Sequence, residues 1–276
     1  MKYEPIKHSI DSFISKRPSI KRLFFKLLDL YLLRTWHVHK ELRKIRSDYK
    51  DGLTVLDGGA GFGQYSFWIL KKFKNAEITG VDISQSHVDK AQVFFDQSGF
   101  KGRAFFEQGD LTKYAKPNSF DVIVSVDVME HILDDRKVFE NFHLSLKENG
   151  ILFVSTPSDQ GGSDVHDHDH DHENDGSASF IDEHVRDGYG VEDITEKLKT
   201  AGFSKVEANY TYGTPGKISW KLLMKIPISL LNISKVFFIL LPFYWIIVYP
   251  FCLILNYADT QGTHKTGTGL MVKAYK

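Results

Sequence analysis

Short apolar runs alternate with longer amphipathic segments over most of the chain after residue 50. The run from Thr54 to Asp57 ends in glycines, as a buried strand does, and from there strand-like runs alternate with helical segments. Strands that alternate with helices predict a mostly parallel sheet with helices on both faces, a doubly wound α/β fold. The expected strands are 53–57, 77–81, 103–107, 120–126, 150–155, 204–212 and 268–275, and the expected helices are 64–73, 86–98, 135–147 and 190–202.

Three stretches depart from this alternation. Residues 10–46 combine a broad apolar stripe with many lysines and arginines, which predicts basic helices. Residues 158–180 are rich in Asp, His, Gly and Ser without an apolar period, so we expect a loop. Residues 218–257 are very apolar and aromatic. The expected parts are basic N-terminal helices over 1–50, one domain formed by 51–212 and 268–276, and an apolar helical insertion over 213–267.

Charge and cysteine content narrow the class of protein. Lys plus Arg and Asp plus Glu both number 35, so the net charge is zero and no overall positive field draws in nucleic acid. Cys252 is the only cysteine, which excludes an intrachain disulfide and is typical of a reducing compartment. The first residues lack the apolar run of a signal peptide. We expect a cytoplasmic protein without a nucleic acid partner, and the oligomeric state stays open.

The segment from Val55 to Gly63, Val-Leu-Asp-Gly-Gly-Ala-Gly-Phe-Gly, joins an expected strand to an expected helix. Glycine accepts positive φ and lets a ligand approach the backbone, and a helix start offers free N–H groups. The dinucleotide fingerprint needs glycine at its first, third and sixth places, but Gln64 or Ser66 occupies the sixth. Asp57 at the strand end would repel a pyrophosphate and attract a cationic ligand that carries an amino group and a sulfonium.

Further acids follow the next strands. Asp82 ends the second strand, where a carboxylate can accept hydrogen bonds from both hydroxyls of a ribose. Asp110 follows the third strand, and the fourth leads into Glu130 and His131. In a doubly wound fold, ligands bind at the carboxyl ends of the strands, where all these residues are expected.

With these motifs in this order, the chain resembles the class I S-adenosylmethionine-dependent methyltransferases, in particular the broad group that includes quinone-biosynthesis methyltransferases. The resemblance covers residues 50–212 and 268–276 and implies a Rossmann-like, seven-stranded sheet and methyl transfer from S-adenosylmethionine. It implies that the glycine loop holds the methionine part of the cofactor, Asp82 the ribose and Asp110 the adenine. The implied cofactor residues are Asp57, Gly59, Gly61, Gly63, Asp82, Ile83, Asp110, Leu111 and Val126.

Glu130 and His131 stand where the resemblance places residues on the acceptor side. Because an imidazole can exchange a proton near neutral pH, His131 could take a proton from an acceptor hydroxyl. The alternatives are a local hydrogen bond at a helix start, or a reaction that needs no base because the acceptor is held in line. Glu130 is a candidate for the chemistry or for ordering the loop. Arg186 and Tyr189 are candidates for gripping the acceptor, with packing and helix capping as equal alternatives.

Histidines alternate with aspartates between Val165 and Glu173. Imidazole and carboxylate are both good ligands for zinc or nickel. Alternating residues in one short, low-complexity stretch cannot easily close a tetrahedral site on a rigid backbone. We favour a solvated acidic loop with incidental metal affinity, and we expect no metal site.

The chain carries no charged residue from Val236 to Tyr257, and about 20 apolar residues suffice for a membrane-spanning helix. The segment lies between two strands of one sheet, however, so the chain must leave and return on one side. A monotopic anchor or shallow helical hairpin therefore fits better than a span, with the basic N-terminal helices on anionic headgroups. A soluble cap packed on the domain is the alternative. The insertion is expected to begin at the carboxyl end of the strand 204–212.

The apolar insertion is expected at the carboxyl ends of the strands, where the reaction would take place. This position favours an apolar acceptor drawn from the membrane. We therefore expect a peripheral or monotopic enzyme at the inner face of a membrane that methylates a small apolar molecule on oxygen. The alternatives are methylation of protein or RNA, and a scaffold that binds the cofactor without catalysis. The catalytic domain shows no basic groove with interleaved aromatics, which disfavours RNA, and the intact cofactor motifs disfavour the scaffold.

Overall fold

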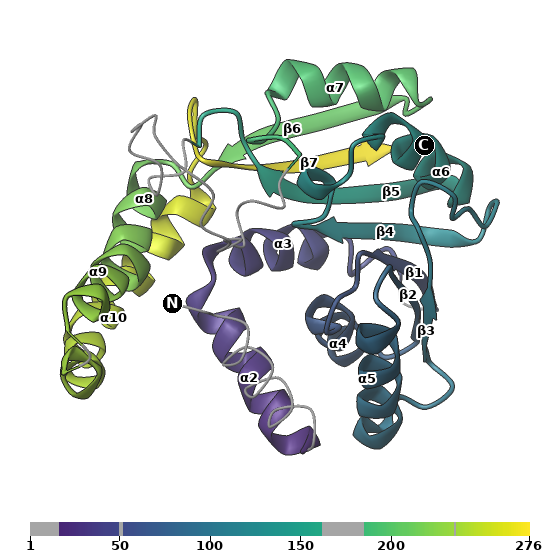
Figure 1. The fold of residues 1–276 in the computed structure, drawn as a ribbon. Coiled ribbons are helices and arrows are strands. Elements are labelled where there is room, and N and C mark those ends of the chain that lie inside the picture. Colours follow the sequence, from purple (N-terminus) through teal and green to yellow (C-terminus); the bar gives the residue numbers. More distant parts are fainter. Residues whose placement is uncertain (1–16, 50–51, 162–184, 235) are drawn as a thin grey trace, which may run out of the picture.

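The computed structural model describes residues 17–49, 52–161, 185–234 and 236–276. The strands are β1 (Leu53–Gly58), β2 (Ala76–Asp82), β3 (Ala104–Gln108), β4 (Phe120–Val126), β5 (Leu146–Pro157), β6 (Lys205–Thr211) and β7 (Gly269–Tyr275). They form one seven-stranded sheet in the order β3-β2-β1-β4-β5-β7-β6 (Figure 1). The predicted alternation of strands and helices and the Rossmann-like α/β fold are confirmed.

One strand of the sheet runs against the others. β1 is parallel to β2 and β4, β2 to β3, and β4 to β5, whereas β7 is antiparallel to both β5 and β6. Pro157 at the end of β5 and Thr211 at the end of β6 both pair with Gly269 at the start of β7. The chain between β6 and β7 therefore leaves and rejoins the sheet at its carboxyl edge, which is where ligands bind in such folds.

Helices cover both faces of the sheet. They are α2 (Pro18–Tyr31), α3 (Leu33–Lys44), α4 (Gln64–Lys72), α5 (Gln85–Phe95), α6 (Asp135–Ser145) and α7 (Val191–Thr200), with the short turns η1 (Asp96–Phe100) and η2 (Met129–His131). Successive residues of a strand point to opposite faces. Val55 of β1 accordingly joins a core with residues of α3, α4 and α5, whereas Leu56 joins a second core with residues of α6 and α7 (Figure 1).

The basic N-terminal segment is divided at Leu32, whose extended backbone (φ −88°, ψ 112°) separates α2 from α3. One side of α2 packs on the domain, where Phe25 is buried against aromatic rings of α4 and α5. The other side stays outside the core: Leu23, Leu27 and Leu30 are 58 %, 42 % and 40 % exposed. The apolar stripe predicted from the sequence is therefore wider than the contact with the domain requires.

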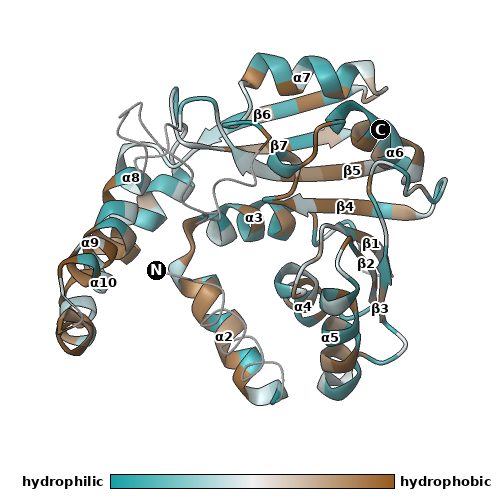
Figure 2. Cartoon of the chain, in the orientation of Figure 1, coloured by the Kyte–Doolittle hydropathy of each residue, from teal (hydrophilic) through white to brown (hydrophobic). Residues whose placement is uncertain are grey.

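The apolar insertion folds into a helical hairpin that projects from the sheet (Figure 1). Its first arm contains α8 (Thr214–Trp220), the π-helical turn η3 (Lys221–Lys225) and α9 (Ile226–Ile233), and its second arm is α10 (Phe237–Gln261). Hydrophobic residues follow both arms toward the tip (Figure 2). By length and composition α10 could cross a membrane, and only 11 % of its most apolar stretch is buried. The hairpin shape agrees with the predicted one; its contact with a membrane stays a prediction.

The largest differences from the predicted boundaries concern one helix and one strand, and the other predicted boundaries lie within two residues of the observed ones. The helix expected over 86–98 ends at Phe95 and continues as η1, in which Gly99 has a φ of 85°. The strand expected over 150–155 extends over 146–157. The composition of residues 147–150 is typical of a turn. In the structure these residues belong to β5, and its pairing with β4 is irregular at this point.

Candidate active site

Three glycines shape the loop between β1 and α4. Gly59, Gly61 and Gly63 have φ angles of 81°, 51° and 80°, the left-handed region that glycine enters without steric cost. The N–H groups of Gly59 and Ala60 donate to the carbonyl of Val81 on β2, over 2.8 and 2.9 Å. Gly63 occupies the N-cap of α4 and has no side chain to cap the helix, and in the first turn the N–H of Ser66 donates to the carboxylate of Asp57. The loop is thus held against the neighbouring strand, and the helix start keeps N–H groups for a ligand.

The glycines differ in what a side chain would meet. A Cβ on Gly59 would lie 2.2 Å from Cγ2 of Val128, and one on Gly63 would lie 2.6 Å from the ring of Phe95. A Cβ on Gly61 would meet no protein atom within 4 Å. Packing therefore requires Gly59 and Gly63, whereas Gly61 faces open space. Such space beside bare backbone fits a ligand that approaches the loop closely.

Asp57 lies at the carboxyl end of β1 and is 3 % exposed. Its Oδ2 accepts a hydrogen bond from Oγ of Ser66 over 2.6 Å. Burial raises the pKa of Asp57 to about 6, against the lowering effect of Ser66, and the nearby charge of Asp82 adds to the rise. A cation next to this carboxylate would stabilise its charged form. The site therefore favours a ligand with an ammonium or sulfonium group.

Asp82 ends β2 and joins it to the tip of the glycine loop. Its Oδ2 accepts from the N–H of Gly61 over 2.8 Å, and its Oδ1 accepts from the N–H of Ser84 over 2.9 Å. Oδ1 also lies 3.2 Å from Nδ1 of His87. Burial alone would raise the pKa of Asp82, but the hydrogen bonds from His87, Ser84 and Gly61 outweigh it and hold that pKa below its usual value. Asp82 is therefore ionised at neutral pH, and its contact with the ribose of the cofactor stays a prediction.

Two exposed apolar side chains flank Asp82. Ile83 is 74 % exposed, and Phe62 in the glycine loop is 37 % exposed. The ring centroid of Phe62 lies 4.9 Å from that of His87. Apolar surface next to a few polar anchors is typical of a small-molecule site. Ile83 was among the predicted cofactor residues, whereas Phe62 was missed because a residue between two glycines was interpreted only as part of a turn.

The remaining cofactor candidates lie in different surroundings. Asp110 accepts hydrogen bonds from Oγ1 of Thr112 over 2.7 Å and from its N–H over 2.9 Å, and these bonds lower its pKa. Leu111 is 6 % exposed and belongs to the core under α6, while Val126 is half-buried at the end of β4. Asp110 is therefore the more accessible member of the pair that follows β3. The cofactor contacts of these residues stay predictions.

The turn η2 carries the two acceptor-side candidates. Glu130 is 1 % exposed, and its Oε2 accepts from Oγ1 of Thr156 over 3.1 Å. Its backbone carbonyl accepts from the N–H of Val185 over 3.0 Å. These contacts favour loop ordering, the alternative that the sequence left open for Glu130. His131 is half-buried at the end of η2, and its action as a base stays a prediction.

Arg186 and Tyr189 both turn toward Asp135 in the first turn of α6. Arg186 forms an ion pair with Asp135, and its Nη2 donates to the carbonyl of Ile132 over 2.6 Å. The hydroxyl of Tyr189 donates to Oδ2 of Asp135 over 2.8 Å, and the side chain has no exposed surface. Burial raises the pKa of Tyr189, and the hydrogen bond to Asp135 raises it further. These contacts favour packing and capping over the predicted acceptor grip, because a buried carboxylate at a helix start needs such partners.

The sequence did not indicate a charge pair that forms where β4 ends. Asp127 follows β4 with a φ of 53°, and its carboxylate forms an ion pair with the guanidinium of Arg34 at the start of α3. The N–H of Arg34 donates to the hydroxyl of Tyr212, just after β6, over 2.9 Å. Asp127 adjoins Val128, which packs against Gly59. The start of α3 and the end of β6 therefore meet beside the glycine loop.

A buried acid fixes the root of the hairpin. Asp259 is the only charged residue of α10 and has no exposed surface. Its Oδ1 lies 2.9 Å from Nε2 of His37 and accepts from the N–H of Tyr212 over 3.1 Å. Its Oδ2 accepts from the N–H of Gly216 over 2.9 Å and lies 3.4 Å from Nε2 of His264. Burial alone would raise the pKa of Asp259, but these partners, His37 first, hold it below its usual value.

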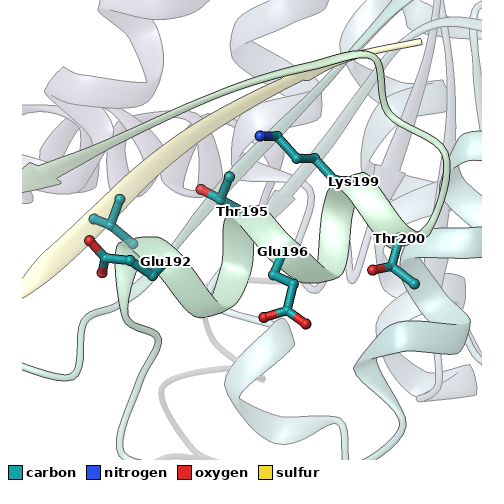
Figure 3. A pocket seen from close by; sticks show the side chains of 6 residues that line it. Glu192, Thr195, Glu196, Lys199 and Thr200 are labelled. Atoms are coloured by element: carbon teal, nitrogen blue, oxygen red, sulfur yellow. The ribbon is translucent and has the colours of Figure 1, made fainter.

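A hollow also lies on the surface of α7 and does not belong to the site at the carboxyl edge (Figure 3). The side chains that line it all belong to this one helix, and none of them takes part in the contacts at the carboxyl edge. We assign it no role. Its lining residues are Val191, Glu192, Thr195, Glu196, Lys199 and Thr200.

The alternating histidines and aspartates between residues 165 and 173 lie outside the described residues. The same holds for most of the loop predicted over 158–180. Their interpretation as a solvated loop without a metal site stays a prediction.

A family model described as a methyltransferase domain matches residues 49–202. The chain belongs to this family. The match includes the glycine loop and the acids at the ends of β1, β2 and β3. It confirms the predicted resemblance to class I S-adenosylmethionine-dependent methyltransferases, and with it the enzyme class and the cofactor, S-adenosylmethionine.

Curated relatives of this methyltransferase act on different acceptors. Phosphoethanolamine N-methyltransferase 3 of Arabidopsis thaliana is 30 % identical over 162 residues, which are 58 % of this chain and 31 % of that protein. Sterol 24-C-methyltransferase ERG6B of Gibberella zeae is 33 % identical over 106 residues, 38 % of this chain and 28 % of that protein. The chain thus spans less than a third of the length of these relatives.

Solved structures share the fold of this methyltransferase. Phosphoethanolamine N-methyltransferase 2 of Haemonchus contortus, in complex with phosphomonomethylethanolamine and S-adenosylhomocysteine, is similar with a TM-score of 0.56 and 22 % identity over 87 % of this chain and 52 % of that one. An S-adenosylmethionine-dependent methyltransferase from Mesorhizobium loti has a TM-score of 0.53 and 16 % identity over 86 % of this chain and 97 % of that one. At such identities the likeness concerns the fold.

Proposed function

We propose that this protein transfers the methyl group of S-adenosylmethionine to a small apolar molecule drawn from a membrane, as a peripheral or monotopic protein at the inner membrane face. One observation carries the proposal: the apolar hairpin leaves the sheet after Thr211 and returns at Gly269, on the same edge as the glycine loop and its acids. Asp259 fixes the root of the hairpin at this edge. An acceptor dissolved in lipid would therefore reach the cofactor without a long path through water.

The residues at the edge fit the cofactor. When bound, S-adenosylmethionine supplies a methyl group on a positively charged sulfur. The open space at Gly61 accommodates a ligand against the backbone, the buried carboxylate of Asp57 suits its cationic part, and the ionised Asp82 can accept from ribose hydroxyls. Ile83 and Phe62 offer apolar surface for the adenine ring.

Oxygen is the acceptor atom that we propose. A lone pair of the acceptor oxygen forms the new bond to the methyl carbon while the carbon–sulfur bond breaks and its electrons stay on sulfur. His131 takes the proton of the acceptor hydroxyl. Much of the rate comes from holding the acceptor in line with the carbon–sulfur bond. The ion pair of Arg34 and Asp127 lies at the carboxyl edge of the sheet, where we expect the acceptor.

A nitrogen acceptor is the second candidate. The relative from Arabidopsis thaliana is named for N-methylation of phosphoethanolamine. The carboxylate of Asp127 at the end of β4, while paired with Arg34, can accept a hydrogen bond from the N–H of a neutral amine. An amine on an apolar body would then replace the hydroxyl compound as substrate.

The test is transfer of a labelled methyl group. The full-length protein is incubated with methyl-labelled S-adenosylmethionine and a total lipid extract of the source cell, and the labelled product is identified by mass spectrometry. We expect a labelled apolar molecule, and at least tenfold less of it with Asp82→Ala. Label only in added protein or RNA, or no label at all, would contradict the proposal.

A variant of the proposed base separates the two acceptor atoms. His131→Asn should slow oxygen methylation by about a hundredfold, since general bases contribute about 10² to 10⁴. Methylation of a free, neutral amine needs no such base and should stay within a few-fold. A labelled product methylated on nitrogen, with His131→Asn as active as the parent, would favour the second candidate.

A further inference from the structure

The tip of the hairpin exposes apolar side chains in several directions. Phe238, Ile239 and Leu240 follow one another on α10 and are 72 %, 70 % and 53 % exposed, and successive helix residues point about 100° apart. On the other arm Ile228 and Ile233 are 50 % and 76 % exposed. A helix that packs on a protein partner concentrates its apolar residues on one face. Apolar residues all round the tip instead match a surrounding apolar solvent, the interior of a bilayer.

The first arm sets the depth to which the tip can enter. α9 has 8 residues, about 12 Å at a rise of about 1.5 Å per residue, and half of a bilayer's hydrocarbon core is about 15 Å. Lys221 and Lys225 directly precede α9, so deeper insertion would carry their ammonium groups into hydrocarbon. α10 is long enough to cross a membrane, but its end is held in the protein by Asp259.

Cations and aromatic residues mark where the bilayer surface would lie. Lys217 and Lys221 stand four residues apart on the first arm. On α2, Arg22 and Lys26 are exposed beside the exposed leucines of that helix. The two elements touch: the ring of Tyr31 on α2 lies 6.4 Å from that of Trp245 and 4.8 Å from that of Tyr249 on α10. Lysines, arginines and aromatic rings are the residues that favour the headgroup region.

We infer that the hairpin enters one leaflet of an anionic bilayer to the depth of α9, with Lys217, Lys221 and the cations of α2 at the phosphate headgroups. The inference deepens the proposed function and rests on its membrane premise, because it names the surface that supplies the acceptor. The carboxyl edge of the sheet, from which the hairpin projects, then lies toward that surface.

The single cysteine allows a direct test of depth. Cys252 is buried, and in a Cys252→Ala background Phe238→Cys places one thiol at the tip. Leu144→Cys places a matched thiol at the end of α6, on a side chain that is 47 % exposed in the parent. Both variants are treated with a membrane-impermeant maleimide, with and without vesicles of phosphatidylcholine and phosphatidylglycerol. We expect vesicles to slow labelling of Phe238→Cys at least tenfold and to leave Leu144→Cys unchanged.

Each other result overturns a stated part of the inference. Unchanged labelling of Phe238→Cys on vesicles would exclude insertion and leave a soluble cap. Labelling of Phe238→Cys by maleimide trapped inside the vesicles would show that the hairpin crosses both leaflets. Ile233→Cys repeats the test if Phe238→Cys does not fold. Neither cofactor nor acceptor takes part, so a failure here is distinct from a failure of methyl transfer.

A charge variant tests the choice of lipid. Lys217→Gln combined with Lys221→Gln should weaken association with phosphatidylglycerol-containing vesicles by about tenfold or more. Association with pure phosphatidylcholine vesicles should change little. Equal binding of parent and variant to both kinds of vesicle would overturn the anionic part of the inference.

Discussion

The glycine loop and the root of the hairpin lie on the same edge of the sheet but obtain their geometry in opposite ways. The loop is local: a few residues between Val55 and Gly63 set its shape through positive φ angles and bonds to the next strand. The root forms around Asp259 of α10, and its partners come from α3, the end of β6, α8 and the residues before β7. A backbone shape can be specified by adjacent residues, whereas a buried charge needs partners from wherever the fold brings them.

The largest effect on stability is expected in the glycine loop. Gly59→Ala would place a Cβ 2.2 Å from Val128 at a φ of 81°. Overpacking and a left-handed backbone together should cost about 4 kcal/mol. Gly61→Ala is the matched control: its Cβ meets no protein atom within 4 Å, so it should cost only about 1 kcal/mol.

The same pair separates packing from binding. Gly61→Ala fills the space that we assign to the ligand, so its affinity for S-adenosylhomocysteine should fall at least tenfold although the protein stays folded. Thermal melting and calorimetric titration of both variants measure these effects. Equal melting temperatures for Gly59→Ala and Gly61→Ala would contradict the packing requirement at Gly59. Full affinity of Gly61→Ala would contradict the ligand contact at Gly61.

A smaller loss is expected at the root. Asp259→Asn removes the charge that two histidines and two backbone N–H groups share, and should lower the free energy of unfolding by about 3 kcal/mol. Cys252→Ala, two turns earlier on α10 and also buried, should lower it by about 1 kcal/mol. Urea unfolding of the two variants checks the difference. Similar losses in both would mean that hydrophobic packing alone holds the hairpin in place.

The smallest effect concerns pH. Burial raises the pKa of Asp57 from 3.8 to about 6, so folding favours the protonated form. The stabilising effect of this group is complete below about pH 4 and is lost as the pH rises to about 6. A cationic cofactor favours the ionised form instead, so its affinity should rise about tenfold from pH 5 to pH 7, with release of a proton.

Asp57→Asn tests this pH dependence. The variant should lose the proton release and most of the rise in affinity, which calorimetry in buffers of different ionisation enthalpy can measure. Proton release that is the same in parent and Asp57→Asn would assign the titration to another group.

The two regions also explain how far the sequence could predict the molecule. The strands and covering helices were predicted within a few residues, because the spacing of apolar residues and the glycines between elements are local signals. The positions of Asp57, Asp82 and the glycines followed from the same signals. Arg34 and Tyr212, however, meet across 178 residues, and no pattern along the chain relates them.

Residue type alone was also insufficient to predict the role of a side chain where that role depends on burial. Tyr189 and Arg186 suit an acceptor site or a packing site equally well, and only their contacts with Asp135 favour packing. Asp259 stands near the C-terminal end of a very apolar helix. The sequence indicated membrane contact for this helix, but it did not indicate that a buried charge fixes the root of the hairpin. Phe62 was not predicted as a site residue, because a residue between two glycines was interpreted only as part of a turn.

We expect S-adenosylmethionine to bind at the carboxyl edge through Asp82, and calorimetric titration of the parent and of Asp82→Ala measures this contact. Two hydrogen bonds to a charged acceptor are worth about 1.5–3 kcal/mol each, so the variant should bind at least tenfold more weakly while its melting curve still shows a folded protein. Asp96→Ala, an exposed acid after α5, should bind like the parent. Unchanged affinity in a folded Asp82→Ala protein would show that Asp82 does not hold the cofactor.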